Sequence, residues 1–261
     1  MDVFWTLPPV TRTITAAAVV ISALGYAGII SLSQFVFFHP YVFTIKALPQ
    51  IWRLVTAFFI TKPKMGIALD PYFLYQYGSG LERESSRFSQ PGDFLVYTVF
   101  TGSLIAEKST LTCFKALAGY FLNAYTFLPA LTLAYAYTYS QDNPSRKVSF
   151  FIITFDAKYL PLALLFMTLI MDGPAPALSQ ATGLVAAHMF DFLTRIWPTF
   201  GGGTNYITTP AVVKGWFGGG AGTQQARSYG MAQQGRSTAD VPASGRSTGT
   251  NPWGPGRRLG E

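Results

Sequence analysis

The sequence predicts an all-α membrane protein, in which residues 1–200 form a bundle of six transmembrane helices and residues 201–261 form a disordered tail. Composition predicts the membrane, because 49% of the residues are hydrophobic and only 12% are charged, about half the charged fraction of an ordinary soluble domain. Long uncharged segments predict the helices. A change of composition at Gly201 predicts the tail, since fifteen of the 25 glycines lie from that residue onward.

The remaining composition excludes two classes of protein. A single cysteine, Cys113, excludes an internal disulfide and with it a disulfide-stapled secreted domain. The net charge of +7 is spread over predicted loops and the tail and forms no basic patch interleaved with aromatic residues, so we expect no nucleic acid as a partner.

The first predicted span covers residues 13–32, a run of 20 residues without a charge, which is about the length that crosses the hydrocarbon core as a helix. A cleaved signal peptide is the alternative, but its apolar region would be shorter and would end at a small-residue cleavage site. Arg12 precedes this span, and the positive-inside rule therefore predicts a cytosolic N-terminus. Residues 33–56 mix aromatic and basic residues with prolines and predict an interfacial loop or in-plane helix on the luminal side.

Five further segments complete the predicted bundle, with four spans in total as the alternative to six; the five are residues 66–81, 94–106, 116–139, 148–171 and 175–200. Basic residues after the fourth span and in the tail predict that both termini are cytosolic. Several spans are short or contain ionisable residues, which in a membrane usually face a bundle interior or a watery cavity. We therefore expect a hydrated interior, or helix ends at the interface, around Asp70, Asp156, Lys158, His188 and Asp191.

Two motifs in the predicted membrane domain combine packing and interface residues. Trp52 and Arg53 follow the first span; tryptophan is suited to the interface, and arginine can hydrogen-bond backbone carbonyls or lipid phosphates from there. Residues 72–77, Tyr-Phe-Leu-Tyr-Gln-Tyr, lie in the second span and are followed by Leu81 and Glu82.

A third motif lies in the sixth span, and a fourth lies at the end of the tail. Gly183 and Ala187 are small residues four positions apart, a spacing that lets two helix backbones approach closely. In the tail, residues 253–260 place two large apolar side chains in a polar, glycine-rich segment. Such a peptide can add to a sheet edge, with Trp253 and Leu259 entering pockets while glycines permit close backbone approach; these glycines are Gly254, Gly256 and Gly260.

Together these segments resemble the Derlins, rhomboid-like pseudoproteases of the endoplasmic reticulum, over residues 1–210 and the last ten or so. The resemblance implies a rhomboid-like fold for residues 1–200. It also implies a role in the retrotranslocation of misfolded proteins, aided by local bilayer thinning and a hydrated groove. Residues 253–260 resemble the SHP box, through which Derlins recruit the AAA+ ATPase called valosin-containing protein. The further partners implied are ubiquitin ligase subunits, misfolded client proteins, membrane lipid, and other copies or relatives in a homo- or hetero-oligomer.

No catalytic residue, cofactor or metal is expected. Rhomboid proteases pair a serine in the fourth span with a histidine in the sixth, and His188 lies near that histidine's place, but residues 116–139 contain no serine. We therefore interpret His188 as a packing or hydrogen-bonding residue. An active intramembrane protease, a channel-type transporter and a purely structural adaptor for the ATPase are the alternatives.

Overall fold

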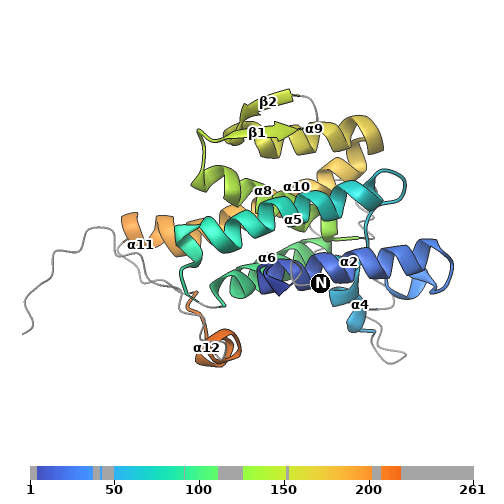
Figure 1. Cartoon of the computed structure of the whole chain (residues 1–261), viewed down its shortest axis with the longest axis horizontal. Coiled ribbons are helices and arrows are strands. Elements are labelled where there is room, and N and C mark those ends of the chain that lie inside the picture. Colours follow the sequence, from blue (N-terminus) through green and yellow to red (C-terminus); the bar gives the residue numbers. More distant parts are fainter. Residues whose placement is uncertain are drawn as a thin grey trace, which may run out of the picture. The chain divides into compact units, whose positions relative to one another are not determined.

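The computed structural model describes residues 5–37, 42, 50–90, 92–110, 126–150, 153–201 and 207–218. Six helices of 13 residues or more lie in these ranges (Figure 1). They are α2 (Pro9–Tyr26), α5 (Gly66–Glu84), α6 (Asp93–Thr110), α8 (Leu128–Asp142), α9 (Leu160–Asp172) and α10 (Pro174–Asp191). The shorter elements are η1 (Leu32–Gln34), α4 (Trp52–Thr56), η2 (Ala57–Phe59), η3 (Ser86–Phe88), β1 (Lys147–Phe150), β2 (Ile153–Asp156), η4 (Ala157–Tyr159), η5 (Phe192–Ile196), α11 (Trp197–Phe200) and α12 (Ala211–Gly218).

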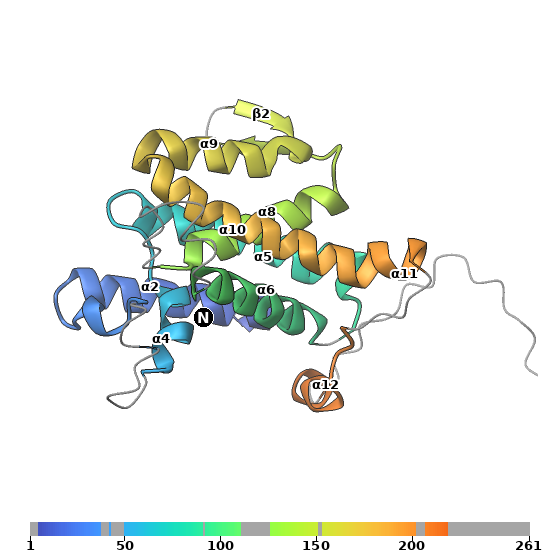
Figure 2. The ribbon, with the colours of Figure 1, turned by 180° about the vertical axis from the view of Figure 1, so that it is seen from behind.

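Helix α8 is the central helix of the bundle. It packs most extensively against α10 and α5 and also contacts α6 and α9, and the two opposite views in Figures 1 and 2 both show it among these helices. Twelve of its 15 residues are buried. A helix that is enclosed on all sides has to be apolar all round, which explains why its sequence shows no polar face.

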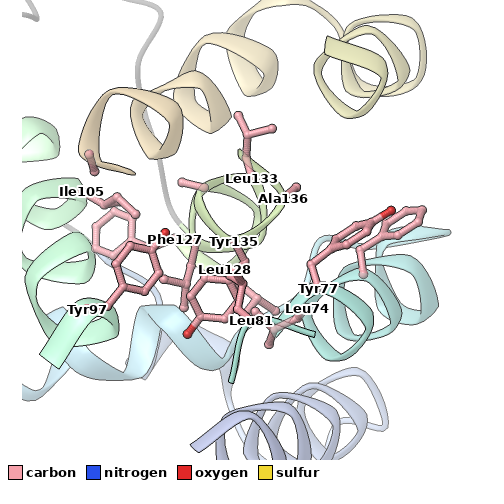
Figure 3. Close-up of a cluster of buried hydrophobic side chains, with 14 of the residues drawn as sticks. Leu74, Tyr77, Leu81, Tyr97, Ile105, Phe127, Leu128, Leu133, Tyr135 and Ala136 are labelled. Atoms are coloured by element: carbon pink, nitrogen blue, oxygen red, sulfur yellow. The ribbon is translucent and has the colours of Figure 1, made fainter. Parts of the chain in front are cut away.

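Aromatic side chains fill the core between α5, α6 and α8 (Figure 3). The ring of Tyr135 lies 5.9 Å from that of Tyr97, and both side chains are fully buried. Both hydroxyls have hydrogen-bond partners within the core. Tyr97 Oη donates to the Ala134 carbonyl at 3.0 Å, and Tyr135 Oη lies 2.7 Å from Thr98 Oγ1. Satisfied phenols let this core combine large apolar area with polar contacts that specify its packing.

The first three helices match the predicted spans, with one shift. Helix α2 begins and ends earlier than residues 13–32, because Pro9 favours the first helical position and Gly28, with φ at +77°, lies just beyond the end. Helix α5 begins at Gly66 as predicted and continues through Pro71 to Glu84. Helix α6 covers the predicted residues 94–106, and α8 covers the second part of residues 116–139, of which residues 111–125 lie outside the described ranges.

The predicted fifth span, residues 148–171, is wrong in its first half, because the helix begins only at Leu160. Strands β1 and β2 pair antiparallel, with Lys147 as the register partner of Asp156 and Phe150 as that of Ile153. The helix begins only at Leu160, where a proline occupies the first turn, and ends after 13 residues at Gly173, whose φ is +92°. The charged residues of the predicted span therefore precede the helix, with Asp156 on β2 and Lys158 on η4.

The sixth predicted span, residues 175–200, is one continuous helical rod. Helix α10 passes through the π-helical turn η5 into α11, which ends at Phe200. Beyond it, residues 211–218 form helix α12. The prediction that the whole tail from residue 201 is disordered is therefore wrong for this stretch. Residues 202–206 and 219–261, which include the predicted SHP box at 253–260, lie outside the described ranges.

Length and composition single out one helix in the described part of the chain, Pro9–Tyr26, as able to cross a membrane. The other five long helices are shorter or more polar, so the count of six spans stays a prediction. The helices do alternate in direction between two ends. One, the Arg87 end, holds the start of α2 and the ends of α5, α8 and α10, and the other, the Asp172 end, holds the opposite termini.

Candidate functional site

Two adjoining cavities lie at the Asp172 end, with volumes of about 500 and 220 Å³. The larger is lined by the end of α2, residues 60–64 and the start of α10; the smaller lies between α5 and α9, with Thr132 of α8 in its wall. The residues that line both are Lys62, Pro63, Lys64, Met171, Asp172 and Gln180. Helices α5 and α9 both pack on α8, and the smaller cavity lies in the space between them.

The cavity walls carry charged groups that hold the segment before α5 in place. Lys62 Nζ forms an ion pair with Asp172 Oδ2 at 3.0 Å, and the Lys62 backbone N–H donates to Asp70 Oδ2 at 3.0 Å. Lys64 has φ at +62°, a left-handed conformation found in no other non-glycine residue of the described ranges. Such conformations cost about 1–2 kcal/mol for a residue with a Cβ. They persist where the surrounding structure enforces them, often at functional sites.

Two buried oxygens in the larger cavity have no hydrogen-bond partner within the described part of the chain. They are Thr61 Oγ1 and Gln180 Oε1, on residues that are 0% and 5% exposed. An unsatisfied buried polar group costs about 1–3 kcal/mol, so such groups are normally bonded to water or a ligand. Both residues line the larger cavity and add polar groups to its wall.

The predicted Trp52–Arg53 pair lies at the start of α4, and its two side chains behave differently. Arg53 is 7% exposed, and its Nη1 donates to the carbonyls of Ser33 at 2.6 Å and Val36 at 2.9 Å. Trp52 is 55% exposed. The arginine thus bonds the backbone of the preceding loop, one of the two roles expected from its chemistry, while the tryptophan faces outward.

Residues 72–82 of α5 contact the two helices against which it packs, α8 and α2. Phe73, Tyr77 and Leu81 are buried on one face at helical spacing, whereas Tyr72 is exposed. At the end of this stretch the Glu82 carboxylate accepts from the backbone N–H groups of Val10 and Thr11 at 3.0 and 2.9 Å and from the Thr11 hydroxyl at 2.8 Å. A carboxylate at these orphan N–H groups caps α2 and complements its dipole.

Gly183 and Ala187 lie where α10 crosses α8, the most extensive helix pair in the bundle. A Cβ built on Gly183 would lie 1.8 Å from the Ala130 carbonyl oxygen, and Ala187 is 1% exposed. Gly78 and Gly80 of α5 make similar close approaches, to Thr11 of α2 and the Tyr139 ring of α8. Gly183 is therefore a point of backbone contact between α10 and α8, whereas at Gly78 and Gly80 side chains of neighbouring helices pack onto the backbone of α5.

The exposed His188 forms no arrangement for acyl transfer in the described part of the chain. Its Nδ1 lies 2.9 Å from the hydroxyl of Tyr137, and its ring meets the tyrosine ring edge-on at 6.2 Å. A phenol is not the nucleophile of a serine protease, and the histidine acts here as a hydrogen-bonding residue, as we interpreted it from the sequence.

The Arg87 end carries an ion cluster of which the sequence analysis singled out only Asp191. Arg87 pairs with Asp142 and, at 2.9 Å, with Asp191, which also pairs with Arg195 at 3.2 Å. These charges join η3, which follows α5, to the ends of α8 and α10. Arg87 is 55 residues from Asp142 and 104 residues from Asp191, so no local signal marks these two pairs; only the antiparallel packing of the helices brings them together.

The other predicted interior charges lie elsewhere. Asp70 lines the smaller cavity, whereas Asp156 lies on β2 beside Lys147 at 2.7 Å and Lys158 at 3.7 Å. The hydrogen bond from Lys147 holds the pKa of the Asp156 carboxyl below its usual range. Of these residues, Asp70 lines a cavity and Asp191 is buried, whereas Asp156 and Lys158 lie on β2 and η4; the hydrated interior stays a prediction.

Comparison with known proteins covers the whole chain. The sequence profile of the Der1-like family matches residues 7–211. Derlin-1 of Bos taurus is 30% identical over all of this chain and 98% of its own length, and Derlin-1 of Homo sapiens is 29% identical over the same shares. The probable derlin-2 homolog of Dictyostelium discoideum is 27% identical over 82% of this chain and 81% of its own length. The chain therefore belongs to the Der1-like family, a family of membrane proteins, and this membership supports a role in endoplasmic-reticulum-associated degradation.

Proposed function

We propose that this chain is a non-catalytic membrane component of endoplasmic-reticulum-associated degradation that helps misfolded proteins to leave the lumen. It resides in the endoplasmic reticulum membrane with both termini cytosolic. The Arg87 end then faces the cytosol and the Asp172 end faces the lumen. In this role the chain works with misfolded client proteins, ubiquitin ligase subunits and membrane lipid, in a homo- or hetero-oligomer.

The observation that carries the proposal is the pair of cavities at the Asp172 end. They join a chamber lined by both apolar and polar residues, the latter including the buried Thr61 and Gln180, to the space between α5 and α9. A polypeptide cannot enter lipid unaided, because each unsatisfied backbone group costs several kcal/mol there. A polar cavity that continues between two helices supplies hydrogen-bonding groups along part of that path and thereby lowers the cost.

Helix lengths support local bilayer thinning. Helix α9 has 13 residues and α8 has 15, which correspond to about 20 and 22 Å at a rise of ~1.5 Å per residue. A hydrocarbon core is about 30 Å thick, and a short span is accommodated by thinning the bilayer around it. Because α9 lies at the side of the smaller cavity, the thinning would occur where the client passes.

The luminal loop has a supporting role in this scheme. Arg53 organises it through the carbonyls of Ser33 and Val36, and Trp52 anchors it at the luminal interface. Gly183 and Ala187 set the spacing of α10 and α8 behind the cavity.

The pulling force comes from valosin-containing protein, recruited by the SHP box at residues 253–260. Trp253 and Leu259 are the two anchors in an extended peptide, and Gly254, Gly256 and Gly260 allow its backbone to lie close to the ATPase. The chain itself performs no chemistry: the pairing of His188 with Tyr137 supports a structural role for the histidine.

Site-specific photocross-linking tests the groove. A photoreactive amino acid replaces Met167, which lines the smaller cavity, in cells that express a misfolded luminal client and in which the ATPase is inhibited to stall export. The matched control is Leu162 on the same helix, which is 67% exposed and lines neither cavity. We expect client adducts from position 167 and few from position 162. Equal adducts at both positions would contradict a groove between α5 and α9.

Peptide binding tests the recruitment of the ATPase. A peptide of residues 249–261 is titrated with purified valosin-containing protein, and a double variant, Trp253→Ala with Leu259→Ala, is the control. Saturable binding that the control peptide lacks supports recruitment. If neither peptide binds, the link to the ATPase has to pass through a partner protein.

A further inference from the structure

Helix α12 (Ala211–Gly218) is a short helix beside the Arg87 end of the bundle that the proposed function does not use. It packs closely on the turn before α6: a Cβ on Gly92, whose φ is +89°, would lie 2.6 Å from Val213 Cγ1 and 3.3 Å from the Phe217 ring. The hydroxyl of Thr209 donates to the carboxylate of Asp93, the first residue of α6. These contacts fix where α12 lies on the bundle.

The faces of α12 differ in what they meet. Val213 and Phe217, one helical turn apart, face the protein. Val212 and Trp216 form a second apolar stripe, which is turned away by about 100° and is exposed, 65% and 72%. Lys214 lies about 200° from both residues of that stripe and lines the polar cavity that also contains Arg87 and Arg195. The helix thus has one side on the protein, one polar side toward charged residues, and one apolar side left exposed.

The orientation of α12 sets it apart from the bundle. In both views the long helices are seen from the side, whereas α12 is seen end-on (Figures 1 and 2). Its axis therefore crosses theirs, and all of these elements belong to one compact unit, residues 1–220. In a membrane protein whose long helices run across the bilayer, an element with this orientation lies along the membrane surface.

We infer that α12 is an in-plane membrane anchor that inserts Val212 and Trp216 into the lipid leaflet next to the Arg87 end. The bound partner is the lipid surface itself. Charged residues of the ion cluster mark the level of the headgroups, and α12 starts beside them. Tryptophan prefers this boundary, and a lysine on the opposite face can remain in water. Short amphipathic helices bind in this way when apolar side chains enter the region between headgroups and acyl chains.

The anchor would also determine where the tail after residue 218 begins. An anchor at residues 211–218 makes the remaining tail start at the membrane surface, so that whatever binds the tail is held close to the bilayer. This inference depends on the membrane location of the family and not on ATPase binding, so either can fail without the other.

The test compares two faces of the one helix in the full-length protein. Cys113 is replaced by serine, and Val212→Cys and Lys214→Cys are each labelled with the environment-sensitive dye NBD. The proteins are placed in phosphatidylcholine nanodiscs, in which both membrane surfaces are open to the solvent. Quenching by phosphatidylcholine with a doxyl group near the head of its acyl chain reports contact with lipid, and reduction by dithionite reports contact with water.

We expect strong doxyl quenching and several-fold slower dithionite reduction at position 212 than at position 214. Equal reduction rates at the two positions would overturn the inference. So would a label at position 212 that is protected from dithionite without doxyl quenching, because that result indicates cover by protein, such as a second copy of the chain.

A second measurement avoids the labels. In the otherwise native chain, the difference in tryptophan fluorescence between the wild type and a Trp216→Phe variant gives the signal of Trp216 alone. The same doxyl lipid should quench this difference signal if the anchor is present, and a signal unchanged by the doxyl lipid would contradict it.

Discussion

Gly183 offers the sharpest test of how the bundle is held together. In Gly183→Ala the new Cβ would lie 1.8 Å from the carbonyl oxygen of Ala130 and 2.6 Å from its carbonyl carbon. Both neighbours are backbone atoms of α8, so no side-chain rotation can relieve the clash. An ordinary contact needs at least 3.4 Å, so α10 and α8 have to separate locally by about 1.6 Å.

The expected loss follows from two opposing effects. Replacing a helical glycine by alanine alone stabilises a helix by about 0.5–1 kcal/mol. Overpacking a close contact typically costs about 1–3 kcal/mol, occasionally more. Because the clash involves the backbones of the most extensive helix pair, we expect a net loss of about 1–2 kcal/mol in the free energy of unfolding.

Reversible unfolding of the purified protein in mixed micelles with increasing sodium dodecyl sulfate, followed by circular dichroism, measures this loss. Gly102→Ala is the matched control, because Gly102 also lies within a long helix and its Cβ would meet only a phenylalanine ring at 3.5 Å. The control should be neutral or stabilising by up to about 1 kcal/mol. If Gly183→Ala were as stable as Gly102→Ala, the close α8–α10 contact would not be a property of the protein in solution.

Three other substitutions test the remaining contacts. Arg87→Ala should lower the free energy of unfolding by about 3 kcal/mol in the same assay, because it leaves Asp142 and Asp191 without their shared cation. The side chains of these two residues are only 11% and 6% exposed. A loss below about 1 kcal/mol would mean that the cluster is solvated. Arg53→Lys should cost about 1–3 kcal/mol and speed limited proteolysis of the preceding loop, because lysine cannot reproduce the guanidinium contacts; an unchanged cleavage pattern would count against its role in the loop. Glu82→Gln should raise hydrogen exchange in the first turn of α2 and cost about 1 kcal/mol, and unchanged exchange there would show that the cap is dispensable.

The first three helices could be predicted because their local signals agree with their tertiary environment. The boundary of α5 at Gly66, for example, follows from an apolar run after a charged and proline-containing segment. The pairing of β1 with β2 could not, because the sequence from Val148 to Phe155 is as apolar as a helical span. Its pairing depends on cross-strand hydrogen bonds that a search for uncharged runs does not consider.

The candidate site likewise has residues that could be predicted from the sequence and a part that could not. Trp52, Arg53, Gly183 and Ala187 could be selected from sequence because each residue type has a chemistry that suits its predicted place. The cavities at the Asp172 end could not, since they combine residues from the end of α2, the segment before α5 and the junction of α9 with α10.

By itself the sequence determined the class of the protein and its family, because hydropathy and short motifs are local properties that composition and spacing express directly. Only the tertiary structure decided which charges meet. Lys62 and Asp172 are 110 residues apart, and Arg87 and Asp191 are 104 apart, yet each pair is within about 3 Å. Such pairs form because antiparallel helices bring distant segments together at the two ends of a bundle, and the identity of those neighbours depends on packing rather than on local sequence.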